Sequence, residues 1–454
     1  MLLDSARHHP VTGRYTFLSC DPALVLRAHG RQVALGPPGH LVPREGNPLA
    51  LLREILAAPP TISIEGVPPC VGGAVGLFGY DLAQAFERLP ARAHDDLHLP
   101  DLLVGIYETM IAIDHATEEA WVITRARPSA TPARAYDEAV ERLETWVDRL
   151  TAGGASSEGE MAGARAHEIR AEVSQAEFAG WVRRAKAWIA AGDIYQANLS
   201  QRLQAPLTTS PWAMYRRLRA VNPSPFAAYV DAGDLQVVSA SPERLVKVSQ
   251  GVVETRPIAG TRPRTGETAR DREQVAELLA HPKERAEHLM LVDLERNDLG
   301  RVCAYGSVEV SEFMATEAYS HVFHIVSNIR GRLRAGLDWL DVAAAVFPGG
   351  TITGCPKIRS LEIIDALEPV RRQFYTGSIG YISFTGAMDW NLVIRSALVT
   401  GGRVYVQAGA GIVADSDPVR EYEETLHKAE ALLVTLRGAA VPQPQGVPDA
   451  VVVG

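Results

Sequence analysis

Short apolar runs separated by turn residues fill the first part of the chain. The runs RYTFLS, ALVLRA, LLVGIYETMIAID and AWVIT are rich in β-branched and aromatic residues, a composition typical of β-strands. A helical period begins only near residues 134–151, where apolar side chains recur every three or four positions. We therefore interpret residues 1–150 as a strand-rich N-terminal region.

The remainder of the chain mixes both periods. The small, polar, glycine-rich residues 151–166 predict a linker. In residues 167–437, a helix at 174–191 precedes strands around 225–250, and helices and strands then alternate irregularly. This pattern favours an α+β fold over a doubly wound sheet. Residues 438–454 lack periodicity, so we expect a disordered tail.

Two pairs of glutamates lie in segments with helical period. Glu284 and Glu287 are spaced i, i+3, as are Glu421 and Glu424, so each pair shares a helix face. If the helices meet, three or four carboxylates crowd together, and each like-charge pair at about 4 Å costs roughly 4 kcal/mol. Oxygen-only ligands suit Mg²⁺, which predicts a magnesium site. For one pair alone, a solvated helix face explains the same spacing.

The composition excludes several classes of protein. There are 45 basic and 54 acidic residues, a net charge of −9, and no basic run, so we expect no nucleic-acid partner. Four scattered cysteines form no CxxC motif, which argues against a zinc site or a disulfide frame. The sequence has neither a leader-like start nor a long apolar run. We therefore expect no membrane partner and a cytoplasmic location.

Two loop-like segments carry candidate hydroxyl groups. In ETRPIAGTRPR (residues 254–264), prolines and Gly260 surround Thr261, which predicts a rigid turn that presents a hydroxyl; an ordinary structural turn is the alternative. FPGGTITGCPK (residues 347–357) has the glycine spacing of a phosphate loop, but Pro356 removes an amide N–H. We reject a nucleotide site there and keep Thr351 and Thr353 as a candidate anion cradle before a helix.

His321 and His324 lie in the strand-like run YSHVFHIVSNIRG. The alternation of a strand puts them on opposite faces. A histidine in such a run is commonly a core residue, but at neutral pH it also suits general acid–base catalysis.

Later strands supply groups suited to a carboxylate ligand. Arg395 offers a bidentate guanidinium, and the AGAG run offers backbone amides. Lys428 lies one turn beyond Glu424, either as its ion-pair partner or as a second contact to a substrate.

Four motifs together resemble the chorismate-utilising enzymes: RPIAGTRPR, AEHLMLVDLERNDLGRV, PGGTITGCPKIRSLEIID and AGAGIVADS. This family includes anthranilate synthase component I, aminodeoxychorismate synthase component I, isochorismate synthase and salicylate synthase. The resemblance covers about residues 1–437. It implies one large α+β chorismate-binding domain, with two β-sheets packed together, helices outside, and the catalytic region at 167–437.

The resemblance also implies the ligand contacts. Mg²⁺ would be held by Glu287 and Glu424, with Glu284 and Glu421 assisting, and would bind the ring carboxylate of chorismate. The enolpyruvyl carboxylate would be held by Tyr381, Arg395, Lys428 and the amides near Gly409 and Gly411. The reacting face would be lined by Thr261, Thr351 and His324, with His324 as the proton shuttle.

Within the family, the segments point to two branches. Ala259 stands where the enzymes that use a lysine read PIKGT, so the chain does not resemble an isochorismate or salicylate synthase. Ala259 and YSHVFHIVSN are typical of anthranilate synthase. GLFGYDLAQAFERLP, DIYQANLSQR and TITGCPKIRSLEIID resemble aminodeoxychorismate synthase instead; anthranilate synthases more often read GYFSYD, IFQVVLSQR and TLSGAPK there. Some chains of that folate branch also carry alanine, so we favour it.

The predicted reaction therefore turns chorismate and ammonia into 4-amino-4-deoxychorismate for folate synthesis. No glutaminase motif is visible, so we expect ammonia from a separate glutamine amidotransferase subunit. Anthranilate synthase component I, which makes anthranilate and pyruvate, is the alternative. A non-catalytic scaffold subunit of the same fold is an alternative of another class.

The resemblance implies a further pocket near the N-terminus. In related chains, the segments corresponding to Asp4-Ser5 and to NPSPF (residues 222–226) form a tryptophan pocket. The candidate lining residues here are Ser5, Asn222, Pro223 and Phe226.

Overall fold

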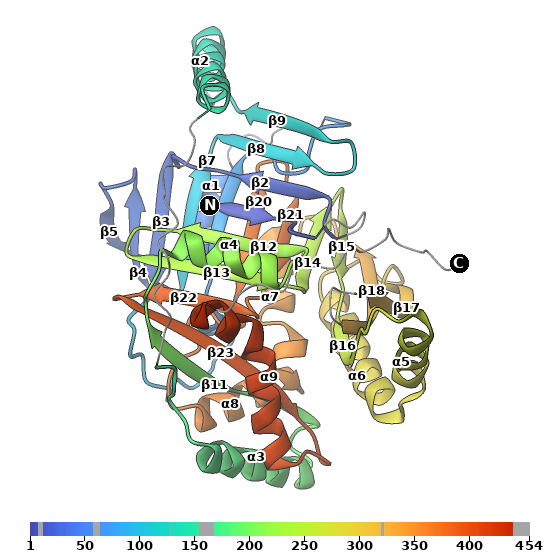
Figure 1. Cartoon of the computed structure of the whole chain (residues 1–454). Helices are drawn as coiled ribbons and strands as arrows, with labels where there is room; N and C mark the ends of the chain where they lie inside the picture. Colours follow the sequence, from blue (N-terminus) through green and yellow to red (C-terminus); the bar gives the residue numbers. More distant parts are fainter. Residues whose placement is uncertain (8–11, 58–63, 128, 154–167, 319–321, 439–454) are drawn as a thin grey trace.

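The computed structural model describes residues 1–7, 12–57, 64–127, 129–153, 168–318 and 322–438. Most of the predicted linker and tail, and His321, lie outside these residues. Two antiparallel sheets dominate the described part of the chain (Figure 1). This confirms the predicted α+β fold with two β-sheets.

The first sheet runs through both parts of the chain. Its strand order is β10 (Arg170–Ala171), β11 (Gln196–Pro206), β23 (Arg403–Ile412), β22 (Ser396–Thr400), β13 (Leu235–Ser241), β12 (Phe226–Asp231), β1 (Leu2–Asp4), β2 (Tyr15–Leu18), β8 (Thr109–Asp114) and β9 (Glu119–Thr124), with β19 (Gly354–Cys355) paired to β11.

The second sheet also combines strands from residues 1–150 with strands from the later part of the chain. Its order is β16 (Ile258–Pro263), β18 (Val322–Arg332), β15 (Val252–Thr255), β14 (Arg244–Ser249), β21 (Met388–Asn391), β20 (Ser378–Ser383), β6 (Gly73–Phe78), β7 (Leu102–Tyr107), β3 (Leu24–His29), β4 (Gln32–Gly36) and β5 (Val42–Glu45), with β17 (Glu309–Ala318) paired to β18.

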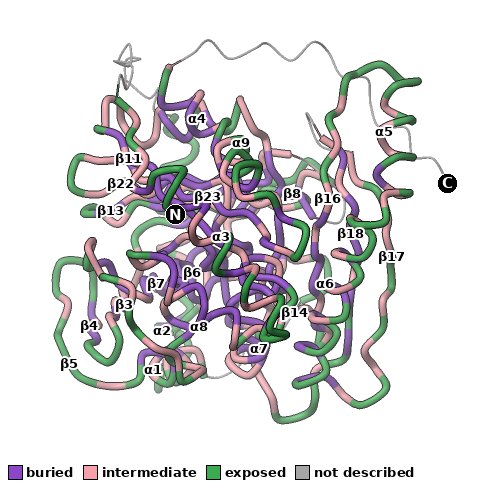
Figure 2. The backbone as a smooth tube through the Cα atoms, turned by 90° about the horizontal axis from the view of Figure 1, so that it is seen from below, coloured by how far each residue is buried: buried purple, intermediate pink, exposed green. Residues whose placement is uncertain are grey.

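Strands that are far apart in the sequence therefore hydrogen-bond directly to each other. β1 pairs with β12, and β6 pairs with β20. Between the sheets, Leu77 and Leu103 of the second sheet share a buried cluster with Val230 and Val237 of the first. Figure 2 shows the buried backbone gathered in the middle of the molecule, while α5, β17 and β5 lie at its exposed margin.

The helices pack on the sheets. They are α1 (Pro48–Leu56), α2 (Pro132–Thr151), α3 (Gln175–Ala190), α4 (Pro211–Val221), α5 (Thr268–Ala280), α6 (Pro282–Gly300), α7 (Trp339–Val346), α8 (Lys357–Leu367) and α9 (Pro418–Arg437), with short 3₁₀ helices η1 (Tyr80–Ala85) and η2 (Gly350–Ile352). α4 and α9 contact the first sheet, and α5 and α6 contact β16 and β18 of the second.

Local signals explain where the predicted helices begin and end. Ser174 and Glu177 form a capping box at the start of α3, and α2 matches the helix expected near 134–151. Asp417 accepts the first backbone N–H groups of α9, and Gly438 ends it with a left-handed φ of 62°. Both helices expected to carry glutamate pairs are thereby confirmed, as α6 and α9.

The segment 254–264 differs from its prediction. It contains the end of β15 and the bulged strand β16 rather than a turn, and the register shifts between Ala259 and Arg262. Gly260 lies in this bulge with φ 65°, a conformation that glycine adopts at little cost. The bulge redirects the side chain of Thr261, so the motif still presents a hydroxyl.

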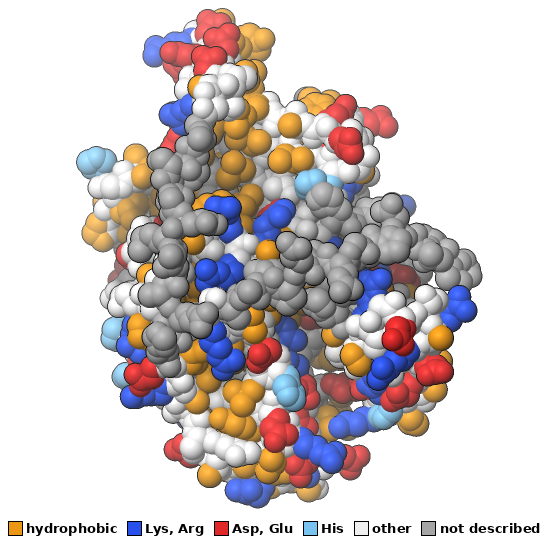
Figure 3. All heavy atoms as spheres, in the orientation of Figure 1, with side chains coloured by type: hydrophobic (Ala, Val, Ile, Leu, Met, Phe, Trp, Pro, Cys, Tyr) orange, Lys and Arg blue, Asp and Glu red, His pale blue; other side chains and the backbone are white. Residues whose placement is uncertain are grey.

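The surface agrees with the mixed charge of the sequence. On the face drawn in Figure 3, acidic and basic side chains are interspersed over the described elements. Among the described helices, none is both long enough and apolar enough to cross a bilayer.

Candidate active site

β16 and β18 bring the predicted threonine and histidine together. Thr261 Oγ1 and His324 Nδ1 are 3.2 Å apart, and the same nitrogen lies 2.9 Å from the carbonyl oxygen of Gly260. Because a carbonyl oxygen only accepts hydrogen bonds, Nδ1 carries the proton. Ala259 pairs with Ile325 beside this histidine and is buried.

The surroundings of His324 keep its ring neutral. Burial lowers the pKa of His324 to about 4; the Gly260 carbonyl opposes this shift, and the charge of Arg395 adds to it. At pH 7 the imidazole is therefore uncharged and able to accept a proton.

The glutamates of α6 lie beside the bulge of β16 and beside β11. A Cβ atom added to Gly260 would lie 3.0 Å from Glu284 Oε2, so Glu284 adjoins the bulge of β16. Its other oxygen, Oε1, lies 3.2 Å from Arg262 Nη1. Glu287 Oε1 accepts a hydrogen bond of 2.9 Å from Gln196 Nε2 of β11.

The glutamates of α9 approach the same place. Burial and then the charge of Glu424 raise the pKa of Glu421. Burial also opposes ionisation of Glu424, but the ammonium of Lys428, 2.7 Å away, outweighs it and lowers the pKa. Lys283 of α6 acts on both of these carboxyls, and Lys428 of α9 acts on Glu287. The two helices therefore converge, as predicted from the sequence.

The convergence stops short of a ready-made metal site. Among the described residues, no three His, Cys, Asp or Glu side chains form a group that could hold a metal ion. Glu284 and Glu424 instead pair with Arg262 and Lys428, which corrects the expectation of a tight cluster. The donor chemistry still fits Mg²⁺, because burial and the charge of Glu284 raise the pKa of Glu287, a cost that a divalent cation offsets.

The glycines of β23 form one wall of the site. A Cβ atom on Gly409 would lie 2.4 Å from Asn198 Oδ1 and 3.0 Å from the Tyr375 hydroxyl. A Cβ atom on Gly411 would lie 3.5 Å from Glu287 Oε1. Only glycine lets β11, β23 and these polar groups approach so closely.

Two cations border this wall. Lys428 Nζ donates to the carbonyl oxygen of Gly409 over 3.1 Å, and Arg395 Nη1 donates to the carbonyl oxygen of Lys428. Burial lowers the pKa of Arg395, and the neighbouring Tyr375 and Glu424 oppose that shift. A guanidinium and an ammonium so close to one small-residue wall suit a ligand that carries carboxylates.

Tyr381 lies elsewhere, which corrects its predicted role. Its ring is 4% exposed and packs on Phe17, with centroids 5.3 Å apart, in a cluster with Val75 and Met110. Strand alternation in β20 points this side chain into the core. The tyrosine that reaches the glycine wall is Tyr375, which precedes β20 and was missed because no periodic pattern marks it.

Glu243 is a further site residue that the sequence analysis missed. Its Oε1 accepts a hydrogen bond of 2.8 Å from Thr351 Oγ1. Burial raises the pKa of Glu243 to about 7, although Thr351, the Ile258 backbone and Lys428 lower it. The available signal was an acidic residue in the short link between two apolar strands, VVSAS and RLVKVS. Thr353, in contrast, donates to the carbonyl oxygen of Gly349 and is fully buried.

The residues of the candidate tryptophan pocket are brought together by strand pairing. Asp4 of β1 pairs with Ala227 of β12, directly after Phe226. Ser5 Oγ donates to the carbonyl oxygen of Tyr15 over 2.6 Å. Asn222 ends α4, and Pro223 follows it in the link to β12. Tryptophan binding by this region stays a prediction.

The comparisons place this fold among the chorismate-binding enzymes. The family model described as chorismate binding enzyme matches residues 6–434, and the chain belongs to this family. It is 42% identical over 434 residues to aminodeoxychorismate synthase component 1 of Bacillus subtilis (strain 168), covering 95% of this chain and 90% of the relative.

Two anthranilate synthases are also similar to this chain. Component 1 from Thermus thermophilus is 48% identical over 388 residues, covering 85% of this chain and 82% of the relative. The crystal structure of anthranilate synthase component I from Streptococcus pneumoniae TIGR4 aligns with a TM-score of 0.83 at 35% identity, covering 94% of both chains. The relatives thus establish a chorismate-converting enzyme and leave its product open.

Proposed function

We propose that this protein is component I of aminodeoxychorismate synthase. The supporting observation is Asn198, in the segment DIYQANLSQR, which lies beside Gly409 and Tyr375. Its Oδ1 is buried and has no hydrogen-bond partner among the described residues, so it is available to an N–H or O–H group of a ligand. In the IFQVVLSQR pattern, which is more common in anthranilate synthases, a valine stands at the position of Asn198. A valine side chain offers no such acceptor.

The substrate is chorismate, and its enolpyruvyl carboxylate is bound by Arg395, Lys428 and the Tyr375 hydroxyl. Gly409 leaves room for the carboxylate to approach the backbone. Glu284, Glu287, Glu421 and Glu424 would hold Mg²⁺, which supplies Lewis-acid stabilisation at the ring carboxylate.

The remaining groups move protons. In the net reaction a C–N bond forms to ammonia, the C4–O bond breaks, and the hydroxyl leaves as water. Glu243, with a pKa of about 7, gives a proton to the leaving hydroxyl, and Thr351 holds its carboxyl group in place. The neutral His324, oriented by Gly260 and Thr261, accepts a proton from the attacking nitrogen.

A separate glutamine amidotransferase supplies the ammonia. The names of the relatives, component 1 in both branches, support a partner subunit. The isolated chain should therefore use ammonium salts, and should use glutamine only after the partner is added.

Anthranilate synthase is the second candidate. Ala259 and YSHVFHIVSN favour it, as does the 48% identity to the Thermus protein. The products distinguish the two enzymes. We would incubate the protein with chorismate, Mg²⁺ and ammonium and analyse the products by mass and fluorescence. An amino compound that keeps its enolpyruvyl group supports the proposal, whereas anthranilate with pyruvate supports the second candidate. Absence of turnover with every partner tested would favour a scaffold role.

A further inference from the structure

A fully buried ion pair lies behind the glycine wall. Glu368 follows α8, and Arg372 lies four residues further along the chain. Arg372 Nε donates to Glu368 Oε2 over 2.8 Å, and its Nη2 donates to Oε1 over 2.6 Å. The two side chains are only 1% and 4% exposed. Neither contacts Arg395, Lys428 or the glutamates of the site in any described bond.

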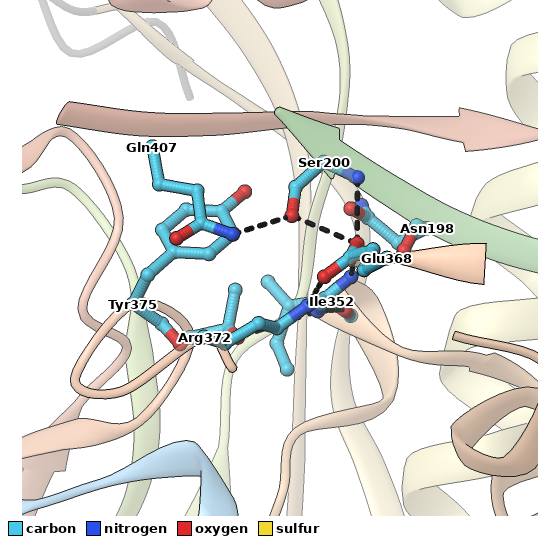
Figure 4. Close-up of polar contacts among 8 residues, drawn as sticks. Asn198, Ser200, Ile352, Glu368, Arg372, Tyr375 and Gln407 are labelled. Carbon is cyan, nitrogen blue, oxygen red and sulfur yellow. Dashed lines mark hydrogen bonds and ion pairs between the residues drawn. The ribbon is translucent and has the colours of Figure 1, made fainter. Parts of the chain in front are cut away.

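The pair is connected to two segments that build the site (Figure 4). Arg372 donates to the carbonyl oxygens of Asn198 and Ile352 over 2.6 and 3.0 Å. Glu368 Oε1 accepts both the N–H and the hydroxyl of Ser200, each at 2.8 Å. β11 and η2 are therefore fixed to one charged centre. The first carries Asn198, and the second carries Thr351.

The backbone after Arg372 is strained. Gln373 and Thr376 have positive φ angles of 54° and 61°, and Tyr375 lies between them. Non-glycine residues adopt this conformation rarely and only where surrounding contacts hold it. One such contact is the hydrogen bond of 3.3 Å from Arg372 Nη1 to Thr376 Oγ1.

The side chain of Tyr375 borders a cavity, so packing does not fix its position on that side. Tyr375 and Arg372 line a small cavity together with Arg202, Ser396 and Gln407. The guanidinium carbon of Arg372 lies 5.7 Å from the centroid of the Tyr375 ring, within reach of a cation–π contact. The hydroxyl of Tyr375 points to Gly409.

We propose that Arg372 and Glu368 are positioning residues for chorismate binding. The pair holds the strained segment 373–376 and the backbone of Asn198, so that the Tyr375 hydroxyl and the Asn198 amide line up with Arg395 at the glycine wall. It acts through those groups and does not touch the substrate. The inference rests on the proposed carboxylate site but is independent of which product the enzyme makes.

The test separates positioning from folding. Replacing both partners, as Arg372→Met with Glu368→Leu, leaves no unpaired charge in the core, so the fold is retained. The hydrogen bonds to Asn198, Ile352 and Ser200 are lost. We expect the Kd for chorismate, measured by equilibrium dialysis with Mg²⁺, to rise at least about tenfold in a protein that still unfolds cooperatively, with a Tm lowered by the unpaired backbone groups of Asn198, Ile352 and Ser200. A Kd within about twofold of the wild type would overturn the proposal.

Two comparisons keep the result decisive. The matched control replaces an ion pair of the second sheet, in which the arginine is buried and the aspartate partly buried, in the same way, as Arg244→Met with Asp389→Leu, and should leave Kd unchanged. If the Arg372 double variant fails to fold, Arg372→Lys is used, because lysine keeps the charge but loses the bidentate geometry; unchanged binding there also overturns the proposal.

A double-mutant cycle with Tyr375→Phe tests whether the ion pair affects chorismate binding through Tyr375. If the pair acts through Tyr375, the effects on Kd are clearly smaller than additive, whereas a general loss of rigidity gives additive effects and contradicts positioning. If the wild-type protein binds no chorismate, the proposed function is wrong. If the Tyr375→Phe variant binds chorismate normally, Tyr375 is not part of the carboxylate site.

Discussion

At the scale of single residues, burial moves two proton-carrying groups in opposite directions. It raises the pKa of the Glu243 carboxyl to about 7 and lowers that of the His324 imidazole to about 4. Both shifts favour the neutral form of the group. At neutral pH the site therefore contains an acid that can still donate and a base that can still accept.

The first prediction concerns Glu243→Gln. Glutamine keeps the shape and an acceptor for Thr351 but cannot donate a proton, so kcat should fall about 100-fold or more. The unfolded chain releases this proton above about pH 4.5 whereas the native carboxyl keeps it up to about pH 7, so stability falls as pH rises between these values. The variant should therefore be more stable than the wild type at pH 8 and similar at pH 5. Thermal unfolding at the two pH values, with steady-state kinetics, would check both parts; full activity in the variant would exclude the donor role.

Gly409 provides the second prediction. In Gly409→Ala the new methyl group would meet Asn198 Oδ1 at 2.4 Å and the carbonyl oxygen of Leu199 at 2.9 Å, so β11 and β23 must separate. Chorismate binding should weaken at least about tenfold. The control is Gly180→Ala in α3, where a Cβ meets nothing within 4 Å; this variant should bind normally and be more stable by about 0.5–1 kcal/mol. If both variants bind chorismate equally well, the close approach of β11 and β23 at Gly409 is not needed for binding.

At the scale of elements, α6 and α9 are the two halves of the proposed Mg²⁺ site. Each helix brings two carboxylates and one lysine, and each lysine acts on the carboxylates of the opposite helix. The local pairs of Glu284 with Arg262 and of Glu424 with Lys428 compete with any cation. A metal affinity set by this competition is moderate and sensitive to each glutamate.

The third prediction follows from that arrangement. Glu287→Gln and Glu424→Gln should each weaken Mg²⁺ binding about tenfold or more, because a neutral amide replaces a charged ligand. Glu423→Gln changes the same charge on an exposed face of α9 and serves as the control. Calorimetric titration of Mg²⁺ measures the affinity directly. Equal affinity in all three variants would place the ion elsewhere.

Elements with a strong local pattern were the ones that could be predicted from the sequence. α3 and α9 have caps and periodic apolar faces, and the catalytic segments around Thr261 and Glu287 are contiguous motifs. Tyr375 and Glu243 join the site only through long-range pairing, so no local pattern marks them. The direction of Tyr381 could not be predicted because the register of β20 against β6 decides it, and these two strands are far apart in the sequence.

At the scale of the whole molecule, several carboxyl groups are buried with little compensation. Burial raises the pKa of Glu295 to about 8, with nearby Glu243 and Asp298 adding to the shift, and Glu295 Oε2 has no hydrogen-bond partner among the described residues. Asp81 is raised by burial to about 7. Because these native groups hold protons that the unfolded chain releases, stability falls as pH rises through this range.

The fourth prediction is therefore a declining Tm between pH 6.5 and pH 8. The buried histidines, with lowered pKa values, affect stability only at lower pH. Each unbalanced acid contributes about 1.4 kcal/mol per pH unit. Glu295→Gln should flatten the decline, whereas Glu423→Gln should leave its slope unchanged. A flat wild-type profile from pH 6.5 to 8 would show that these acids ionise freely in the native state.

The interleaved strands also dictate how the protein can be made in a cell. β1, β6 and β11 pair with β12, β20 and β23, which are synthesised later. Neither sheet can therefore be completed before the last of these strands has left the ribosome. The nascent chain must keep exposed strand edges until synthesis is nearly complete, which favours association with chaperones. Fragments produced by premature termination would consequently aggregate rather than fold into stable partial domains.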